Sequence, residues 1–374
     1  MNVQSPEILM AIKAKEDLNS WRKTTINLAI SGATTADKYK FISILTNSNL
    51  AEMNECEEYN ILAPVKPKPY FHSNNSNFTV WDLPECYFSN KSDYLNSIEV
   101  NKYDLFFIFN SNNSDQIDLW LAKDLIELKK KVFFIKNYPN FVQSPLDNLI
   151  ETIQVVEANQ HEYSLESDNV YLVSPNIEDR NSLDFIKLLM DVMKSLSSDK
   201  MEALALTLEP FSKEIVHTKY LVLKSKTFYS AFASSILGIS TVLEASICID
   251  LALITNEIWF FIQQFGLEFE NIDKLETLDA SGFDKIISSI SKYEYGSFIL
   301  LNNIQNLSDI VLKIFKELVH LNSQDLVEFF PQIAQILNDS WAFSATRFAL
   351  CSILDDLARI SADIIDFQTK RNQD

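Results

Sequence analysis

Glycine is scarce in this 374-residue chain, which contains 5, and Gly32 is the only one before Gly238. Loops that wrap phosphate groups favour glycine, because backbone N–H groups approach a ligand most closely where no side chain intervenes. The first half of the chain therefore lacks the flexible backbone on which phosphate-binding loops usually depend.

Basic residues are also few. The chain has 32 Lys and Arg against 51 Asp and Glu, which gives a formal net charge of −19. Nucleic acids are bound mainly through Lys and Arg on phosphates, so this balance argues against a nucleic-acid partner. It also argues against a polybasic membrane anchor, and a solvated acidic surface is the simplest explanation.

Cysteine and histidine number four each, they are widely scattered, and no C-x-x-C pair occurs. We therefore expect no zinc or other metal site and a reduced, cytoplasmic compartment. The first 18 residues lack an apolar signal core, and Met1 is not followed by Gly. We expect no signal peptide and no N-myristoylation.

Residues 23–45 have the outline of a phosphate-binding loop, because an apolar strand runs into Gly32 and a helical pattern follows from Lys38. The pattern G-x-x-x-x-G-K-[ST] requires Gly and a hydroxyl where this chain has Asp37 and Tyr39. The Asp37 carboxylate would repel phosphates, and Tyr39 offers no short-reach hydroxyl to Mg²⁺. The alternative is an ordinary strand, loop and helix, with Lys38 as a surface lysine at the helix start.

The segment KPKPYFHSNNSNFTVWDLPE at 66–85 resembles the switch regions of the immunity-related GTPases, a dynamin-like family of interferon-inducible type. Further resemblance follows in the family's order, with two strand segments, the last strand and parts of a helical region, at 103–111, 129–140, 169–176, 219–254 and 262–268. The resemblance spans nearly the whole chain. It implies a P-loop GTPase fold followed by a helical domain.

The resemblance also implies that the phosphate and magnesium groups are damaged. Lys38 takes the place of the phosphate lysine, and the switch I threonine falls near Pro64 and its neighbour Ala63, which have no ligating side chain. Asp82 remains able to serve Mg²⁺ through water. Glu85 replaces the glycine whose N–H would approach the γ-phosphate, and it adds a negative charge.

The guanine-reading motif, [NT]-K-x-D in the family, becomes Asn137, Tyr138, Pro139 and Asn140. Asn140 offers one acceptor oxygen, but not the charge-assisted pair of hydrogen bonds that Asp makes with guanine. Tyr138 replaces the lysine whose stem packs on the base. Ser174 is compatible with the family's fifth motif.

Losses at several positions of one pocket should compound. Each lost charge-assisted contact costs on the order of 1.5–3 kcal/mol, so three or four would weaken a micromolar affinity beyond millimolar. We therefore expect a pseudo-GTPase that needs no cofactor and acts as an interaction or regulatory module in cell-autonomous defence. Its partners would be GTPase relatives or a second copy, bound through the G-domain face. One alternative is a divergent active GTPase that uses GTP, GDP and Mg²⁺, and another is an adaptor whose helical domain binds an intracellular membrane surface.

Alternating strand and helix patterns over 23–200 predict an α/β domain with a mostly parallel sheet covered by helices. The expected strands are 25–30, 77–81, 105–109, 132–135 and 170–173, with helices over 116–130 and 182–196 and an edge strand within 46–76. Residues 201–374 predict an all-helical domain, onto which the resemblance places an amphipathic N-terminal helix within 1–22. The uncharged stretch 227–243 is interpreted as a buried core helix, with a membrane-surface helix or a membrane span as alternatives.

Overall fold

The computed structural model describes residues 19–32, 36–48, 66–84, 91–110, 116–137, 170–174, 183–240, 257–268 and 343–371. The chain divides into two compact units, one formed by Arg22–Thr207 and the other by Met1–Trp21 together with Leu208–Asp374. The units change at 21/22 and 207/208, whereas the sequence pattern predicted limits at 22/23 and 200/201.

A six-stranded sheet organises the unit Arg22–Thr207, with the strand order β2-β3-β1-β4-β5-β6. The only antiparallel pair is β2 with β3, and the other neighbours are parallel. The strands are β1 (Ile26–Ser31), β2 (Lys68–His72), β3 (Asn75–Asp82), β4 (Leu105–Asn110), β5 (Lys131–Asn137) and β6 (Val170–Val173). This mostly parallel sheet confirms the predicted fold class.

Each strand predicted from the sequence coincides with or overlaps an observed strand, and the edge strand expected within 46–76 is β2. The predicted helices over 116–130 and 182–196 are α5 (Gln116–Glu127) and α7 (Phe185–Ser195). The amphipathic helix predicted within 1–22 lies outside the described residues except for 19–22, where Ser20–Arg22 forms the short 3-10 helix η1.

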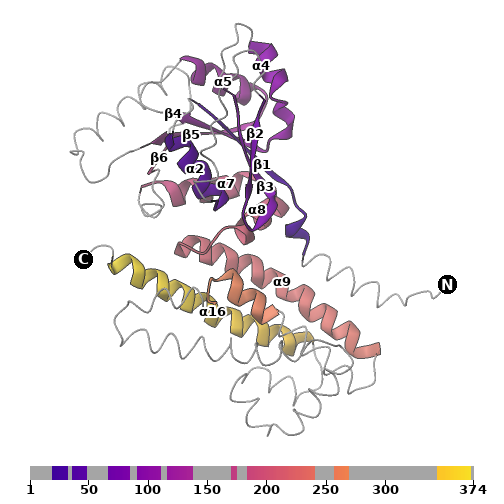
Figure 1. Ribbon diagram of the computed structural model, residues 1–374. Coiled ribbons are helices and arrows are strands. Elements are labelled where there is room, and N and C mark those ends of the chain that lie inside the picture. The colour runs from indigo at the N-terminus through magenta and orange to yellow at the C-terminus, as the bar shows by residue number, and fades with distance from the viewer. Residues whose placement is uncertain are drawn as a thin grey trace, which may run out of the picture. The chain divides into compact units, whose positions relative to one another are not determined.

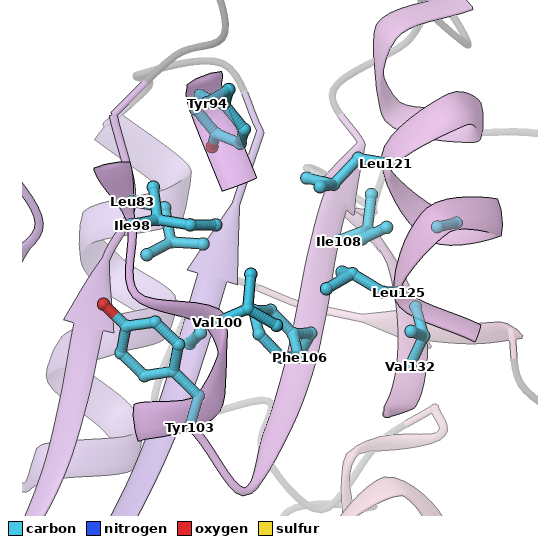
Figure 2. Packing of buried hydrophobic residues seen from close by; sticks show 12 residues of the cluster. Leu83, Tyr94, Ile98, Val100, Tyr103, Phe106, Ile108, Leu121, Leu125 and Val132 are labelled. Atoms are coloured by element: carbon cyan, nitrogen blue, oxygen red, sulfur yellow. The ribbon is translucent and has the colours of Figure 1, made fainter. Parts of the chain in front are cut away.

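One face of the sheet packs against α4 (Lys91–Ser97), α5 and the 3-10 helix η2 (Val100–Lys102). Figure 2 shows this layer, in which Ile108 of β4 lies near Leu121 and Leu125 of α5, whereas Phe106 lies beside Val100 of η2. Because successive side chains of a strand point to opposite faces, Leu105, Phe107 and Phe109 face the other way. They are also buried, as expected for a parallel strand covered on both sides.

The opposite face packs against α2 (Ala36–Thr46) and α7. The Phe41 ring of α2 lies 5.9 Å from Phe107, 5.8 Å from Phe109 and 6.2 Å from Phe185 of α7, measured between ring centroids. This aromatic contact fixes α2 beneath the carboxyl ends of β1 and β4, which is where the candidate site lies.

Helix α8 (Ser198–Thr207) belongs to the same unit as the sheet. The buried Thr207 hydroxyl accepts a 2.8 Å hydrogen bond from Asn75 Nδ2 and donates one to the carbonyl of Ala203. The sequence-predicted limit at 200/201 cuts through α8, because helical periodicity alone does not say which core a helix covers.

The second unit contains helices α9 (Lys213–Ser240) and α16 (Phe343–Arg371), which pack side by side, and a shorter helix over 257–264 (Figure 1). Within α9, Thr227 and Ala231 are buried, whereas the Phe228 and Tyr229 side chains are 45% and 39% exposed. The predicted core helix therefore has an exposed flank at its start, and 241–243 lie outside the described residues. No helix in the described ranges has the length and apolar character needed to cross a bilayer.

Candidate functional site

Gly32 follows β1 at the carboxyl edge of the sheet and has a φ of +124°, a backbone conformation that residues with a Cβ rarely adopt. A Cβ on Gly32 would lie 2.0 Å from the carbonyl oxygen of Phe109 in β4. Close approach of two backbone segments therefore requires this glycine, whether or not a phosphate is bound.

Lys38, on the first turns of α2, is completely buried, with an exposed fraction of 0%. Its Nζ donates a 3.0 Å hydrogen bond to the carbonyl of Gly32 and lies 2.8 Å from Asp82 Oδ1. The alternative of a surface lysine at the helix start is therefore wrong. Helix α2 points this side chain inward, toward Gly32 and the end of β3.

Asp82 is the last residue of β3, and its side chain is 11% exposed. The next residue, Leu83, donates a backbone hydrogen bond of 2.9 Å to Ile30 in β1, which fixes the end of β3 beside the loop. The ammonium of Lys38 and the carboxylate of Asp82 thus neutralise each other in a region that excludes most water, where charges require such pairing. The two groups that the resemblance assigned to phosphate and to Mg²⁺ are bound to each other.

Tyr39 stands where the family pattern requires the magnesium hydroxyl, and its side chain is half-buried. Its ring packs edge-on against Tyr70 of β2, with centroids 6.5 Å apart and an interplanar angle of 65°. Lys68 Nζ lies 5.5 Å from the centroid of the same Tyr70 ring. Tyr39 therefore acts in an aromatic contact between α2 and the edge strand, a role consistent with its unsuitability as a metal ligand.

The remaining described site residues lie along the same edge of the sheet. Asn137 ends β5, and Ser174 directly follows β6 and is buried. The pairing of Asn137 with Val173 sets Ser174 one residue beyond it. The structure thus arranges Asp82, Gly32, Asn137 and Ser174 at the carboxyl ends of β3, β1, β5 and β6, and Lys38 lies on α2, the helix that follows β1.

Several predicted substitutions lie outside the described residues: Pro64, Glu85, Tyr138, Asn140 and the side chain of Asp37. Their predicted effects on phosphate, Mg²⁺ and guanine binding stay predictions. Within the described ranges, no three His, Cys, Asp or Glu side chains gather as a metal site would require.

Two features of the site were not apparent from the sequence. The motifs identified Lys38 and Asp82 separately, but not as partners of one another. Tyr70 was part of the switch-like segment, yet its contact with Tyr39 depends on how β2 pairs with β3. One signal could have suggested the pair: Lys38 and Asp82 both belong to phosphate-site motifs, and in a P-loop fold these motifs lie close together.

Comparison with known proteins adds the family. A family model described as Interferon-inducible GTPase (IIGP) matches residues 2–281. The chain is 24% identical over 316 residues to T-cell-specific guanine nucleotide triphosphate-binding protein 2 of Mus musculus, covering 80% of this chain and 73% of that protein. It is 21% identical over 267 residues to Interferon-inducible GTPase 1 of Mus musculus, covering 67% and 64%.

A solved structure of the FeoB G-domain from Methanococcus jannaschii covers 46% of this chain and 98% of that one, with a TM-score of 0.28 and 16% identity. At that score the superposition carries no argument about the site.

Proposed function

Since the chain belongs to the interferon-inducible GTPase family, we propose that it is a pseudo-GTPase, which keeps the G-domain fold but binds GTP weakly or not at all. The observation that carries this proposal is the buried position of Lys38, 2.8 Å from Asp82. A phosphate lysine must present its ammonium to the nucleotide, and this ammonium is already paired.

Energetics support the proposal. Breaking a buried ion pair costs about 3–5 kcal/mol, which corresponds to a loss of roughly two to four orders of magnitude in affinity. If a triphosphate drew Lys38 away from Asp82, this cost would make its binding free energy less favourable by the same amount. The freed Asp82 carboxylate would then lie close to the anionic ligand, and like charges repel.

Tyr39 supports the same conclusion at the magnesium position. Its ring contact with Tyr70 joins α2 to β2, so a metal ion there would have to do without a hydroxyl from this residue. The fold itself needs neither ligand, because Gly32 and Lys38 have structural partners in Phe109 and Asp82.

We propose further that the protein acts through contacts of its G-domain face with GTPase relatives or with a second copy. The proposed setting is cell-autonomous defence in the cytoplasm, at intracellular membranes. The support for this setting is the family, which includes a Mus musculus protein named Interferon-inducible GTPase 1.

Isothermal titration of the full chain with GTP and GDP in the presence of Mg²⁺ tests the central claim. We expect no saturable heat at micromolar ligand and a dissociation constant of about 1 mM or weaker. A phosphate-release assay should show no hydrolysis above the blank. The proposal fails if GTP binds with a micromolar constant that Lys38→Met abolishes, since Lys38 would then be available to phosphate.

The interaction role is tested by light scattering of the purified chain, alone and with a GTP-loaded relative. We expect the mass of any complex to be the same with and without added nucleotide. A complex that forms only after GTP is added to this chain would contradict the proposal.

A further inference from the structure

The chain passes from one unit to the other at two places, which we call passages. Both passages contact the short helix 257–264 or the turn that ends it. At the first passage, Trp21 is the last residue before the change, and it is buried. Its ring packs on Phe260 of the helix, with centroids 6.1 Å apart and an interplanar angle of 30°.

The second passage contacts the turn that ends the same helix. Gly266 has a φ of +65°, and a Cβ on it would lie 3.1 Å from Cγ of Pro210, two residues after the unit resumes at Leu208. The turn is closed by backbone hydrogen bonds from Gly266 to Gln263 and from Leu267 to Ile262, the pattern of a helix end with a left-handed residue. Pro210 therefore packs on a defined helix end.

Two side-chain hydrogen bonds hold this turn against the long helices. Lys219 Nζ of α9 donates to Gln264 Oε1 at 2.8 Å, with Lys219 only 1% exposed. Ser361 Oγ of α16 donates to the carbonyl of Phe265 at 3.1 Å, in a buried contact. A buried ammonium depends strongly on its acceptors, because water cannot replace them.

The charge environment of Lys219 supports this dependence. Burial lowers its pKa to about 7, and the carboxylate of Glu209 opposes that shift. The charged form of Lys219 therefore carries a large desolvation cost in the folded chain.

We propose that residues 257–267 form an anchor, a segment against which both passages pack: Trp21 at the first and the segment 208–212 at the second. The hydrogen bond from Lys219 to Gln264, which we call the lock, keeps this anchor in place. Loss of this hydrogen bond increases local opening at both passages together, although they are far apart in the chain. The anchor is a conformational device of the helical unit, independent of whether the other unit binds nucleotide.

Amide hydrogen exchange on the full chain tests the anchor with Gln264→Leu, which removes the Oε1 atom that accepts from Lys219 Nζ. We expect exchange about tenfold faster around Trp21 and at 208–212, with β4 and β5 unchanged as an internal reference. The matched control is Gln263→Leu, because Gln263 is exposed on the same helix and should leave both passages protected. Faster exchange at only one passage, or only within 257–267, would overturn the proposal.

Two further variants distinguish loss of the Lys219–Gln264 hydrogen bond from a general disturbance of packing. Lys219→Met combined with Gln264→Leu replaces the polar pair by apolar groups of similar size and should restore protection at both passages. Gln264→Glu keeps an acceptor of the same size and should leave exchange as slow as in the wild type or slower. If neither variant protects the passages, the hydrogen bond does not lock the anchor.

Discussion

The burial of a charged amine in the loop of Gly32 is the most consequential feature at the scale of single residues. Lys38 has no exposed surface, and its Nζ contacts the carbonyl of Gly32 and the carboxylate of Asp82. In an active GTPase, a lysine at this position would bind the phosphates of the nucleotide. Here its interactions stabilise the junction of β1, α2 and β3.

We predict that Lys38→Met lowers the free energy of unfolding by about 3 kcal/mol, because it leaves the Asp82 carboxylate in a largely buried place without its ammonium. Urea denaturation of the full chain measures this change. Lys38→Met combined with Asp82→Asn should recover part of the loss.

The matched control for Lys38→Met is Lys40→Met, on the same helix, at a residue that is only half-buried. We expect it to change stability by less than about 1 kcal/mol. Equal effects of the two variants would show that the pair with Asp82 contributes no particular stability.

At the scale of elements, the hairpin of β2 and β3 is fastened to α8 by one buried hydrogen bond, from Asn75 Nδ2 to Thr207 Oγ1. A second bond within the hairpin, from the backbone N–H of Asn77 to Asn75 Oδ1, holds the Asn75 amide in place. Helix α8 thereby joins the sheet unit, although it lies next to α9 in sequence.

We predict that Thr207→Val destabilises the chain by about 2 kcal/mol, because a buried amide donor loses its acceptor while side-chain volume is conserved. Thermal or urea unfolding measures the loss, and amide exchange should locate it in β2 and β3. Thr218→Val is the matched control, since that hydroxyl lies in an exposed stretch of α9 and donates to the carbonyl of Glu214 in its own helix. The prediction fails if Thr218→Val is as harmful.

At the scale of the whole molecule, stability should depend on pH through Lys219. Burial lowers its pKa to about 7 from the ordinary lysine value of 10.5. Between these values the unfolded chain binds more protons than the folded one, so the free energy of unfolding rises as pH increases from 7 toward 10. The carboxylate of Glu209 is the charged group that moderates the shift.

We predict a slope of up to about 1.4 kcal/mol per pH unit in that window, and a flatter profile for Lys219→Met. Denaturation midpoints measured from pH 7 to 10 check this. Measurement should stop near pH 10, because burial and the charge of Glu99 raise the pKa of Tyr103 to about 12 and ionisation of tyrosine in the unfolded chain then opposes folding. Parallel profiles for the two proteins would rule out Lys219 as the source.

The sequence alone determined the sheet, the helices that cover it and the family. Apolar strands and helical periods depend on local alternation, and the motif remnants retain their order along the chain even when their chemistry is lost. It also identified Gly32, Lys38, Tyr39 and Asp82 as the residues to examine. Such assignments need only neighbours in the chain.

Tertiary structure decided what those residues do. The pair of Lys38 with Asp82, the carbonyl of Phe109 that requires Gly32, and the ring of Tyr70 against Tyr39 all join segments separated by many residues. The assignment of α8 to the sheet and the lock between Lys219 and Gln264 have the same origin. Which polar groups meet in a buried place depends on strand order and helix direction, and no local pattern records either.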